Sequence, residues 1–338
     1  MIGQKHIKAI LRCLIYIISV SLCCACQRSG QDDAAPSGQG LYFWRTALDI
    51  SAADSAYMTT HHVARLYVRF FDVVERNGAP MPQGTIRIDS LHSTLKHREI
   101  IPVVYIDVES LRDLDDDAAG VLAERLVTRV QQMCQTHHIA WHELQLDCDW
   151  TAKTQDRYFA LLRDVRARLK AGGYRLSVTV RLHQLAMPEP DCDYGVLMLY
   201  NTGDFTRAPE GAHPRNPIFD MRDAALYLRH LAHYDLPLTP ALADFSWPLL
   251  YRGDSFEGIL YGVDLQQSSV FQRVADDAYR AISAQEYVLS VGTGEVSLRV
   301  LPGDRVKVWR VSEQQREALL DAIRRLRPSM LRGQILFR

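Results

Sequence analysis

The sequence has no excess of either charge, no repeated unit and no apolar run long enough to dominate it. Its 338 residues include 39 Lys and Arg against 40 Asp and Glu, a formal net charge of −1. Nucleic-acid-binding proteins need a basic excess to meet phosphates, so this balance argues against that class. The 19 Gly and 14 Pro follow no period, which excludes collagen-like and low-complexity polymers. Because 47% of the residues are hydrophobic, the chain can still bury a large core in one or two domains.

Motifs that hold cofactors and metals are also missing. Gly292-Thr293-Gly294 lacks the third Gly of a dinucleotide loop, and no Gly-Lys-Ser/Thr phosphate loop occurs. Gly-x-Ser-x-Gly and His-Glu-x-x-His are both absent, which removes the commonest serine-hydrolase elbow and zinc-protease helix. The pairs His61-His62 and His137-His138 have no second ligand cluster near them in the sequence. We therefore expect no cofactor and no metal.

The amino terminus is typical of a secretory signal. Basic residues between positions 5 and 12 precede an apolar stretch over 14–22, which is shorter than the ~20 residues that a membrane-spanning helix needs. Four of the seven cysteines flank this stretch, three of them at its end, and Cys26 follows the small residue Ala25. The segment resembles a bacterial lipoprotein signal, which implies cleavage after residue 25 and a lipid on Cys26. Cleavage before Cys24 and an uncleaved membrane anchor are the alternatives.

Residues 26–40 follow as a polar stretch with almost no apolar bulk. Such a composition predicts a flexible tether with a reach of roughly 20 Å. The sorting habits of lipoproteins, with Gln27 after Cys26, favour the outer membrane of the cell envelope. If Cys26 is lipidated, three cysteines remain in the folded part, an odd number that predicts no disulfide framework.

From residue 41 to 338, strand-like runs alternate with helical patterns. Eight such units predict a (β/α)₈ TIM barrel, with a doubly wound open sheet as the competing fold. Residues 249–312 are too long for a connection and contain strand runs of their own, so they predict a small β-containing insertion after strand seven. No covering helix is evident after the eighth strand. The eight runs are Leu41–Ile50, Arg65–Val74, Ile100–Val108, Glu143–Trp150, Tyr174–Gln184, Tyr194–Asn201, Leu238–Trp247 and Gln334–Arg338.

Polar side chains follow one face of the fourth predicted strand. Because strand side chains alternate with period two, Glu143, Gln145, Asp147 and Asp149 share a face. Both faces of a covered parallel strand should be apolar, so these residues must line a wet cleft or pair with other groups. Asp149 lies at the carboxyl end of its strand, where barrel active sites are built.

Neighbouring strands offer partners for these carboxyls. We expect Arg181 or Arg69 to hold Asp147 charged. The alternative is an internal salt-bridge network of the two arginines with Asp147 and Asp107, which needs no chemistry at all. Further polar residues expected on the inner face are Tyr67, Tyr105, Thr179, His183 and Tyr200.

Two short motifs resemble those of a known family. The run Gln145-Leu146-Asp147-Cys148-Asp149 resembles the Asp-x-Asp-x-Glu strand ending of chitinase-like glycoside hydrolases, and Met198-Leu199-Tyr200-Asn201 resembles their strand-six Met-x-Tyr-Asp/Asn. An inserted module after strand seven is also a feature of many members. A closer resemblance, across most of 41–338, is to a bacterial lipoprotein domain family grouped with glycosyl-hydrolase-type barrels, which has a similar Gln-x-Asp-x-Asp strand.

The resemblance implies roles for three residues. Asp149 would be the acid, Asp147 would orient the substrate acetamido group, and Tyr200 would hydrogen-bond the reacting carbonyl. Asp149 is one methylene shorter than the usual Glu, on the order of 1 Å of reach, and a misplacement of that size can cost about 10²-fold in rate. Two acids on one strand face also repel and split their proton affinities, which favours Asp149 as the proton donor and Asp147 as the anion.

The sequence thus predicts a lipid-anchored cell-envelope glycoside hydrolase, with substrate assistance if the sugar is N-acetylated. The alternative is a non-catalytic glycan-binding or envelope-assembly lipoprotein with a degenerate barrel site. Four aromatic residues could supply a sugar-stacking platform: Trp44, Trp150, Tyr200 and Trp247. We predict Trp247 for this role, whereas Trp150 should pack on the helix side. The other predicted substrate-binding residues are Gln145, Arg181, Asn201 and Asp107, and the reserve second carboxylates are Glu109, Asp204 and Asp244.

Overall fold

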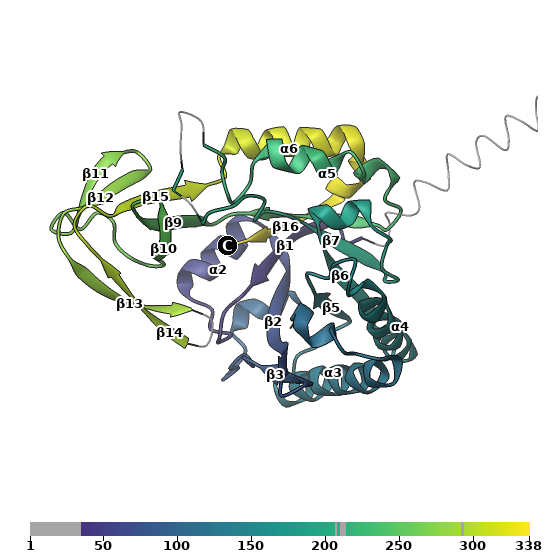
Figure 1. Ribbon diagram of the computed structural model, residues 1–338. Coiled ribbons are helices and arrows are strands. Elements are labelled where there is room, and N and C mark those ends of the chain that lie inside the picture. Colours follow the sequence, from purple (N-terminus) through teal and green to yellow (C-terminus); the bar gives the residue numbers. More distant parts are fainter. Residues whose placement is uncertain (1–34, 207, 210–213, 292–293) are drawn as a thin grey trace, which may run out of the picture.

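The computed structural model describes residues 35–338 apart from 207, 210–213 and 292–293 (Figure 1). The predicted signal segment, Cys26 and nearly all of the predicted tether lie outside the described residues. Among the residues that are described, no helix has the length and apolar character to cross a membrane.

Eight parallel strands close into a barrel, because β1 pairs with β16 on one side and with β2 on the other. Around the ring the order is β1, β16, β8, β7, β6, β5, β4 and β2. All eight predicted runs supply a barrel strand, and the closed ring excludes the doubly wound open sheet. The barrel strands are β1 (Gly38–Phe43), β2 (Val63–Arg76), β4 (Glu99–Ile106), β5 (Glu143–Asp147), β6 (Arg175–Arg181), β7 (Tyr194–Leu199), β8 (Leu238–Ala243) and β16 (Gly333–Phe337). Outside the ring, β3 (Ala79–Gln83) pairs antiparallel with β2.

Helices lie between most of the barrel strands. The connection between β6 and β7 holds only the 3₁₀ helix η4 (Leu182–Ala186), and no helix follows β16 within the described residues. At the start of α3, Asp115 accepts a hydrogen bond from the Ala118 amide at 2.8 Å, whereas the side chain of Thr154 makes no such cap bond at α4. The helices are α2 (Ala52–Thr60), α3 (Asp116–Thr136), α4 (Gln155–Ala171), α5 (Met221–Leu228) and α6 (Glu313–Leu326).

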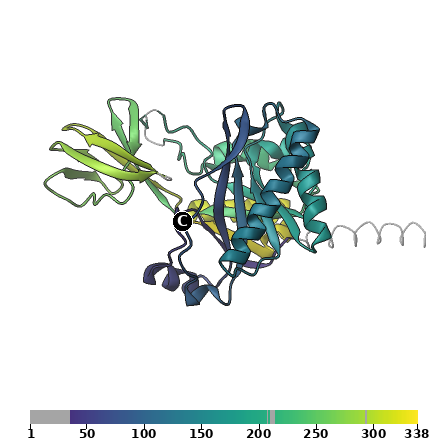
Figure 2. The same cartoon turned by 90° about the horizontal axis from the view of Figure 1, so that it is seen from below.

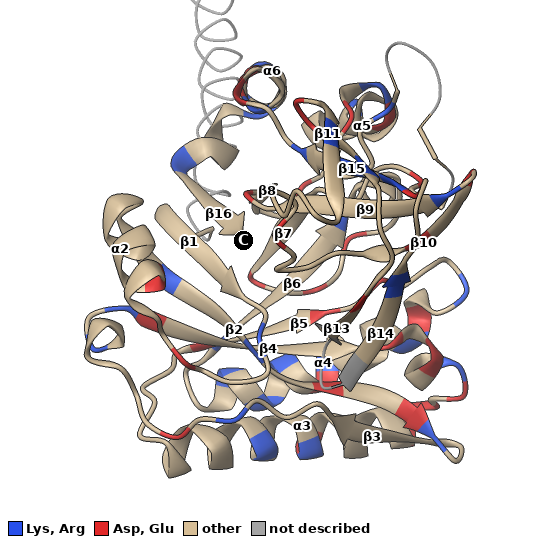
Figure 3. Cartoon of the chain, turned by 90° about the vertical axis from the view of Figure 1, so that its left-hand side faces the viewer, with Lys and Arg blue, Asp and Glu red and all other residues tan. Residues whose placement is uncertain are grey.

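A β module follows β8, the seventh barrel strand, and projects to one side of the barrel (Figures 1 and 2). Five antiparallel strands form its sheet in the order β10, β9, β15, β12, β11, and two more form a hairpin. Basic and acidic residues are interspersed over the barrel and the module (Figure 3), in keeping with the balanced charge. The strands are β9 (Ser246–Arg252), β10 (Ser255–Ile259), β11 (Phe271–Ala275), β12 (Ala278–Ala281) and β15 (Arg305–Arg310), with β13 (Gln285–Val291) and β14 (Gly294–Val300) in the hairpin.

The barrel separates two cores. Outward-facing strand residues such as Leu144 and Leu146 pack with Leu126 of α3 and Leu161 of α4, in the layer between sheet and helices. A second, aromatic-rich cluster fills the barrel interior and extends to the β module. The predicted outward position of Trp150 is confirmed, since it is 1% exposed and belongs to the outer layer.

Candidate active site at the carboxyl ends of the barrel strands

The deepest part of the barrel interior holds a hydrogen-bonded polar cluster around Glu143. Its Oε1 accepts hydrogen bonds from Ser177 Oγ at 2.6 Å and from the Tyr194 hydroxyl, and Oε2 pairs with Arg175 at 2.6 Å. The Tyr194 hydroxyl also lies 2.8 Å from that of Tyr67. Burial raises the pKa of Glu143, against the opposing effect of Arg175. This carboxyl is completely buried and satisfied, so its role is internal.

Gln145 forms the next layer toward the carboxyl ends of the strands. Its Oε1 accepts a hydrogen bond from the Tyr42 hydroxyl at 2.6 Å, and its Nε2 donates to Ser177 Oγ at 3.2 Å. Gln145 is 0% exposed and does not line the pocket that opens above it, whereas Tyr42 does. The predicted substrate-binding residue Gln145 therefore lies one layer below the pocket and holds the tyrosine that faces it.

Asp147 lies at the floor of the pocket. The residue is buried, and its carboxyl accepts a hydrogen bond from Thr179 Oγ1 at 2.6 Å and lies 3.9 Å from Arg181 Nη2. Burial raises the pKa of Asp147, because desolvation disfavours the anion more than Arg181 and Thr179 favour it. A buried carboxyl with a raised pKa, facing a cavity, is a group that can hold a proton for chemistry.

Asp149 is placed differently from Asp147 although it belongs to the same row. It accepts a hydrogen bond from Arg181 Nε, and its side chain is 45% exposed against 6% for Asp147. The guanidinium of Arg181 thus lies between the two carboxyls. The expected pairing of Arg181 with Asp147 is present, and Asp149 joins the same cluster.

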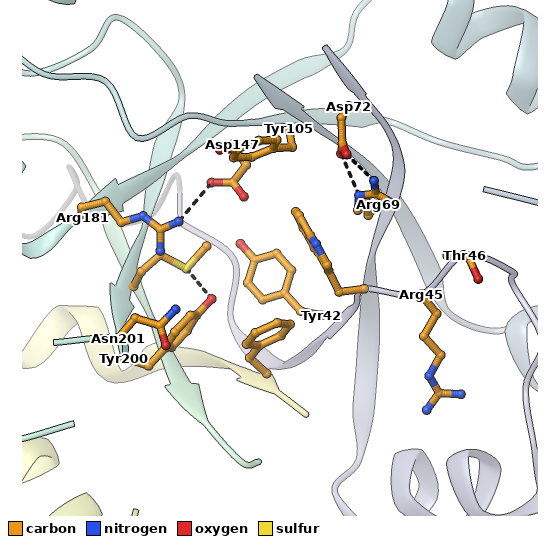
Figure 4. Close-up of a pocket in the computed structure, with 13 residues that line it drawn as sticks. Tyr42, Arg45, Thr46, Arg69, Asp72, Tyr105, Asp147, Arg181, Tyr200 and Asn201 are labelled. Atoms are coloured by element: carbon orange, nitrogen blue, oxygen red, sulfur yellow. Dashed lines mark hydrogen bonds and ion pairs between the residues drawn. The ribbon is translucent and has the colours of Figure 1, made fainter. Parts of the chain in front are cut away.

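The main pocket has a volume of about 690 Å³ and opens where the barrel strands end (Figure 4). Its walls are rich in aromatic rings, which suit the apolar faces of sugar rings. Beside it, a second pocket of about 390 Å³ contains Asp149 and shares Arg181, Tyr200 and Asn201 with the main one. The aromatic residues lining the main pocket are Tyr42, Trp44, Tyr105, Tyr200 and Phe337.

Tyr200 stands between the two pockets. Its ring stacks on Phe337 with centroids 5.2 Å apart, and its hydroxyl donates to Met198 Sδ at 2.8 Å. A thioether is a weak acceptor, so the hydroxyl can exchange this contact for a better one with a ligand. The next residue, Asn201, is exposed and has φ 57°, a backbone conformation that Asn tolerates better than most residues.

Asp72 is a pocket carboxylate that the sequence did not reveal. It lines the main pocket and forms an ion pair with Arg69, which also donates to the Gly84 carbonyl at 3.2 Å (Figure 4). Strand alternation assigns Asp72 to the opposite face from Arg69. A bulge in the β2–β4 pairing between Arg69 and Phe71 reverses the alternation and turns Asp72 inward. Arg69 therefore pairs with Asp72, and not with Asp147 or Asp107.

Two predicted substrate-binding residues lie away from both pockets. Asp107 caps a 3₁₀ turn, where its carboxyl accepts from the Glu109 amide at 3.4 Å. Trp247 is 9% exposed and packs between Phe205 and Phe245, at centroid distances of 5.5 and 5.4 Å.

The tryptophan that does line the main pocket is Trp44. Of the reserve carboxylates, Glu109 pairs with Arg112, Asp244 pairs with Arg316 at 2.9 Å, and Asp204 accepts from a backbone amide. These three line neither pocket. Among the described residues, no group of three or more His, Cys, Asp or Glu side chains could hold a metal ion.

Comparisons with known proteins place this fold among chitinase-like barrels. No model of a known protein family matches the chain, and no curated protein does. Among solved structures, the Bacillus cereus spore cortex-lytic enzyme SleL is similar with a TM-score of 0.51 and 14% identity, over 89% of this chain and 70% of that one. A chitinase from Chromobacterium violaceum gives 0.50 and 14%, over 89% and 93%. The Group IV chitinase of Ostrinia furnacalis gives 0.50 and 13%, over 89% and 92%. The chain thus shares the barrel fold of chitinase-like proteins, as its motifs suggested.

Proposed function

We propose that this protein is a glycoside hydrolase-like enzyme that binds a glycan in the main pocket and cleaves a glycosidic bond by carboxylic acid catalysis. The observation that carries the proposal is the Asp147–Arg181–Asp149 cluster. One carboxyl is buried with a raised pKa, and the other is half-exposed and ion-paired with a guanidinium. Glycoside cleavage needs a protonated carboxyl and an anionic group, and environments that separate two carboxyls in this way supply both.

The proposed roles are the reverse of those expected from the sequence. Asp147 holds the proton, because its burial disfavours the anion. Asp149, paired with Arg181, supplies the negative charge that stabilises a developing positive charge at the sugar carbon. On an N-acetylated sugar, the acetamido oxygen can act as the nucleophile, and the Tyr200 hydroxyl can donate to that group in place of its contact with Met198. Trp44 and Tyr42 supply ring faces for the sugar.

A second candidate function is glycan binding without turnover. The observation that favours it is how tightly the carboxyls are engaged: Asp147 is 4% exposed and bonded to Thr179, and Asp149 is held by Arg181. A groove of this kind can recognise a saccharide without giving its acids access to the leaving oxygen.

A turnover and binding assay on N-acetylated oligosaccharides separates these two functions. We expect the wild type to cleave, and Asp147→Asn to lose at least about 100-fold in kcat while still binding. Burial raises the pKa of Asp147, so kcat should persist at pH values above the ordinary pKa of a carboxyl group. It should then fall as the pH rises through the raised pKa of Asp147. Binding that Trp44→Ala weakens, without turnover by the wild type, supports the binding function. If the wild type neither binds nor cleaves these oligosaccharides, both functions are refuted.

We also propose that the protein is a lipoprotein of the bacterial cell envelope, anchored through Cys26, with the outer membrane as its destination. The support is the sequence around the predicted cleavage point and Gln27 after the cysteine. Labelling with a radioactive fatty acid in a bacterial host should mark the wild type and Cys24→Ser but not Cys26→Ser. Label that persists in Cys26→Ser would contradict the assignment.

A further inference from the structure

The five-stranded sheet of the β module has two chemically different faces. On one face, Trp247 lies opposite Trp309, and both belong to the aromatic cluster that continues into the barrel interior. Strand alternation puts Ser246 and Pro248 of β9 on the other face, opposite Arg310 and Val308 of β15. This second face points away from the barrel cluster.

A continuous groove follows that outer face. Two hollows, of about 820 and 370 Å³, share Gln266, Tyr279, Val308 and Arg310 and therefore join. The larger hollow extends to the first residues of α6, and none of the residues lining either hollow lines the main pocket or the Asp149 pocket. We call the two joined hollows the outer groove.

Aromatic and amide groups in the outer groove are arranged as a sugar-binding surface requires. Tyr261 is 45% exposed and lines the smaller hollow, so its ring is accessible from the groove. Gln266 Nε2 donates to the Tyr279 hydroxyl at 2.9 Å. Within the described part of the chain, the side-chain amide oxygen of Gln266 accepts no hydrogen bond and the Arg310 side chain pairs with no carboxylate, so both remain open to a ligand.

Most charges around the groove are already neutralised by neighbours. Arg222 pairs with Asp220 at 2.5 Å, and Arg273 pairs with Asp276 at 2.8 Å. Asp277 pairs with a lysine of β15 at 2.6 Å. Groups engaged in this way do not select strongly for a charged ligand. The groove also contains the Asp264 carboxylate, which has no ion pair among the described residues. An exposed ring, a free amide oxygen and one unpaired charge of each sign favour an uncharged, hydroxyl-rich ligand.

From these contacts we infer that the outer groove is a second glycan-binding site, which holds a polysaccharide strand independently of the barrel pocket. The assignment of the ligand as a glycan rests in part on the proposed function. Polysaccharide is the class that matches the groove in length as well as chemistry, because the groove extends from Tyr261 to the start of α6. Two linked sites raise the affinity for a polymer well above that for a short oligosaccharide.

The test is co-sedimentation of the purified protein with insoluble chitin and with peptidoglycan sacculi. Tyr261→Ala and Arg310→Ala should each raise the apparent Kd for at least one polymer about threefold to tenfold. Neither change should affect binding or turnover of short soluble oligosaccharides. The matched control is Arg280→Ala, because Arg280 is also exposed but alternates onto the opposite face of the sheet.

The outcomes keep the two proposals distinct. Polymer binding that depends on Tyr261, in a protein that cleaves nothing, supports the outer groove and refutes the hydrolase. Cleavage together with unchanged polymer binding in Tyr261→Ala and Arg310→Ala refutes the groove and leaves the hydrolase standing. Polymer binding lost equally in Arg280→Ala would also overturn the assignment, since the loss would then not be specific to this face. Folding of each variant is checked by its thermal unfolding.

Discussion

Replacing Arg181 by Met tests the arrangement of the candidate site most directly. The substitution keeps most of the side-chain volume and removes the guanidinium that faces both carboxyls. Asp147 would then be a buried carboxyl without a cation, and its pKa, already raised by burial, should rise further. Asp149 is half-exposed and loses only a solvent-screened partner, so its contribution to the free energy of unfolding should be small.

The expected cost follows from burial and geometry. Breaking a fully buried ion pair costs about 3–5 kcal/mol. Here Arg181 is 22% exposed and lies 3.9 Å from Asp147, so we expect about 2–3 kcal/mol at pH 8. At pH 5 the cost should be smaller, because protonation relieves the uncompensated charge. A carboxyl with a raised folded-state pKa loses its stabilising contribution as the pH rises, with a slope of up to about 1.4 kcal/mol per pH unit.

Urea unfolding of four proteins measures this effect: the wild type, Arg181→Met, Asp147→Asn and the double variant. Asp147→Asn keeps an oxygen that accepts from Thr179, so it should be tolerated on its own. In the double variant no buried charge is left, and we expect a favourable coupling free energy of at least about 1 kcal/mol at pH 8. Additive effects, or an Arg181→Met cost that does not grow between pH 5 and pH 8, would refute the placement of Asp147 as a buried carboxyl stabilised by Arg181.

Three further predictions concern other parts of the molecule. Gly195→Ala should cost about 1–3 kcal/mol in thermal unfolding, because its new Cβ would lie 2.8 Å from a Leu238 methyl in the barrel wall; a neutral result would show that the wall yields easily. The pKa of Asp54 is lowered mainly by the hydrogen bond from Arg45, so this carboxylate stabilises the fold above its ordinary pKa near 3.8. Asp54→Asn should therefore be destabilising at pH 7, and in urea titrations the difference should begin to shrink below that value and disappear as the pH falls through the lowered pKa. A difference independent of pH would contradict this assignment. Trp44→Ala should weaken oligosaccharide binding about threefold to tenfold in calorimetry with unchanged unfolding, and equal affinity would remove this ring from the site.

The barrel could be predicted from the sequence because its signal is local and repeated. Most of the strands are rich in apolar residues, and α3, α4 and α6 show helical spacing. The row of polar residues on β5 also revealed the inward face, since Glu143, Gln145 and Asp147 all lie inside the barrel as alternation requires.

The rest of the site depends on a strand bulge, on contacts between distant segments and on depth of burial, none of which can be recognised in a single sequence. The bulge near Phe70 turns Asp72 inward and gives Arg69 a partner three residues away, and nothing in the local pattern marks where a strand will bulge. The choice between Trp44 and Trp247 as the pocket tryptophan depends on how the β module meets the barrel, a contact between distant segments. The different burial of Asp147 and Asp149 depends on their depth in the barrel, which alternation alone does not give.

The polar interior of the barrel has a consequence for folding specificity. A purely apolar barrel interior specifies the strand register only weakly, since one apolar side chain can take the place of another. Here, displacing β5 by two residues would set Glu143 where Gln145 now meets Tyr42 and would separate the carboxylate from Arg175. Any other register of the barrel strands would leave a buried donor or acceptor without a hydrogen-bond partner. These internal hydrogen bonds therefore favour one register of the barrel over the others.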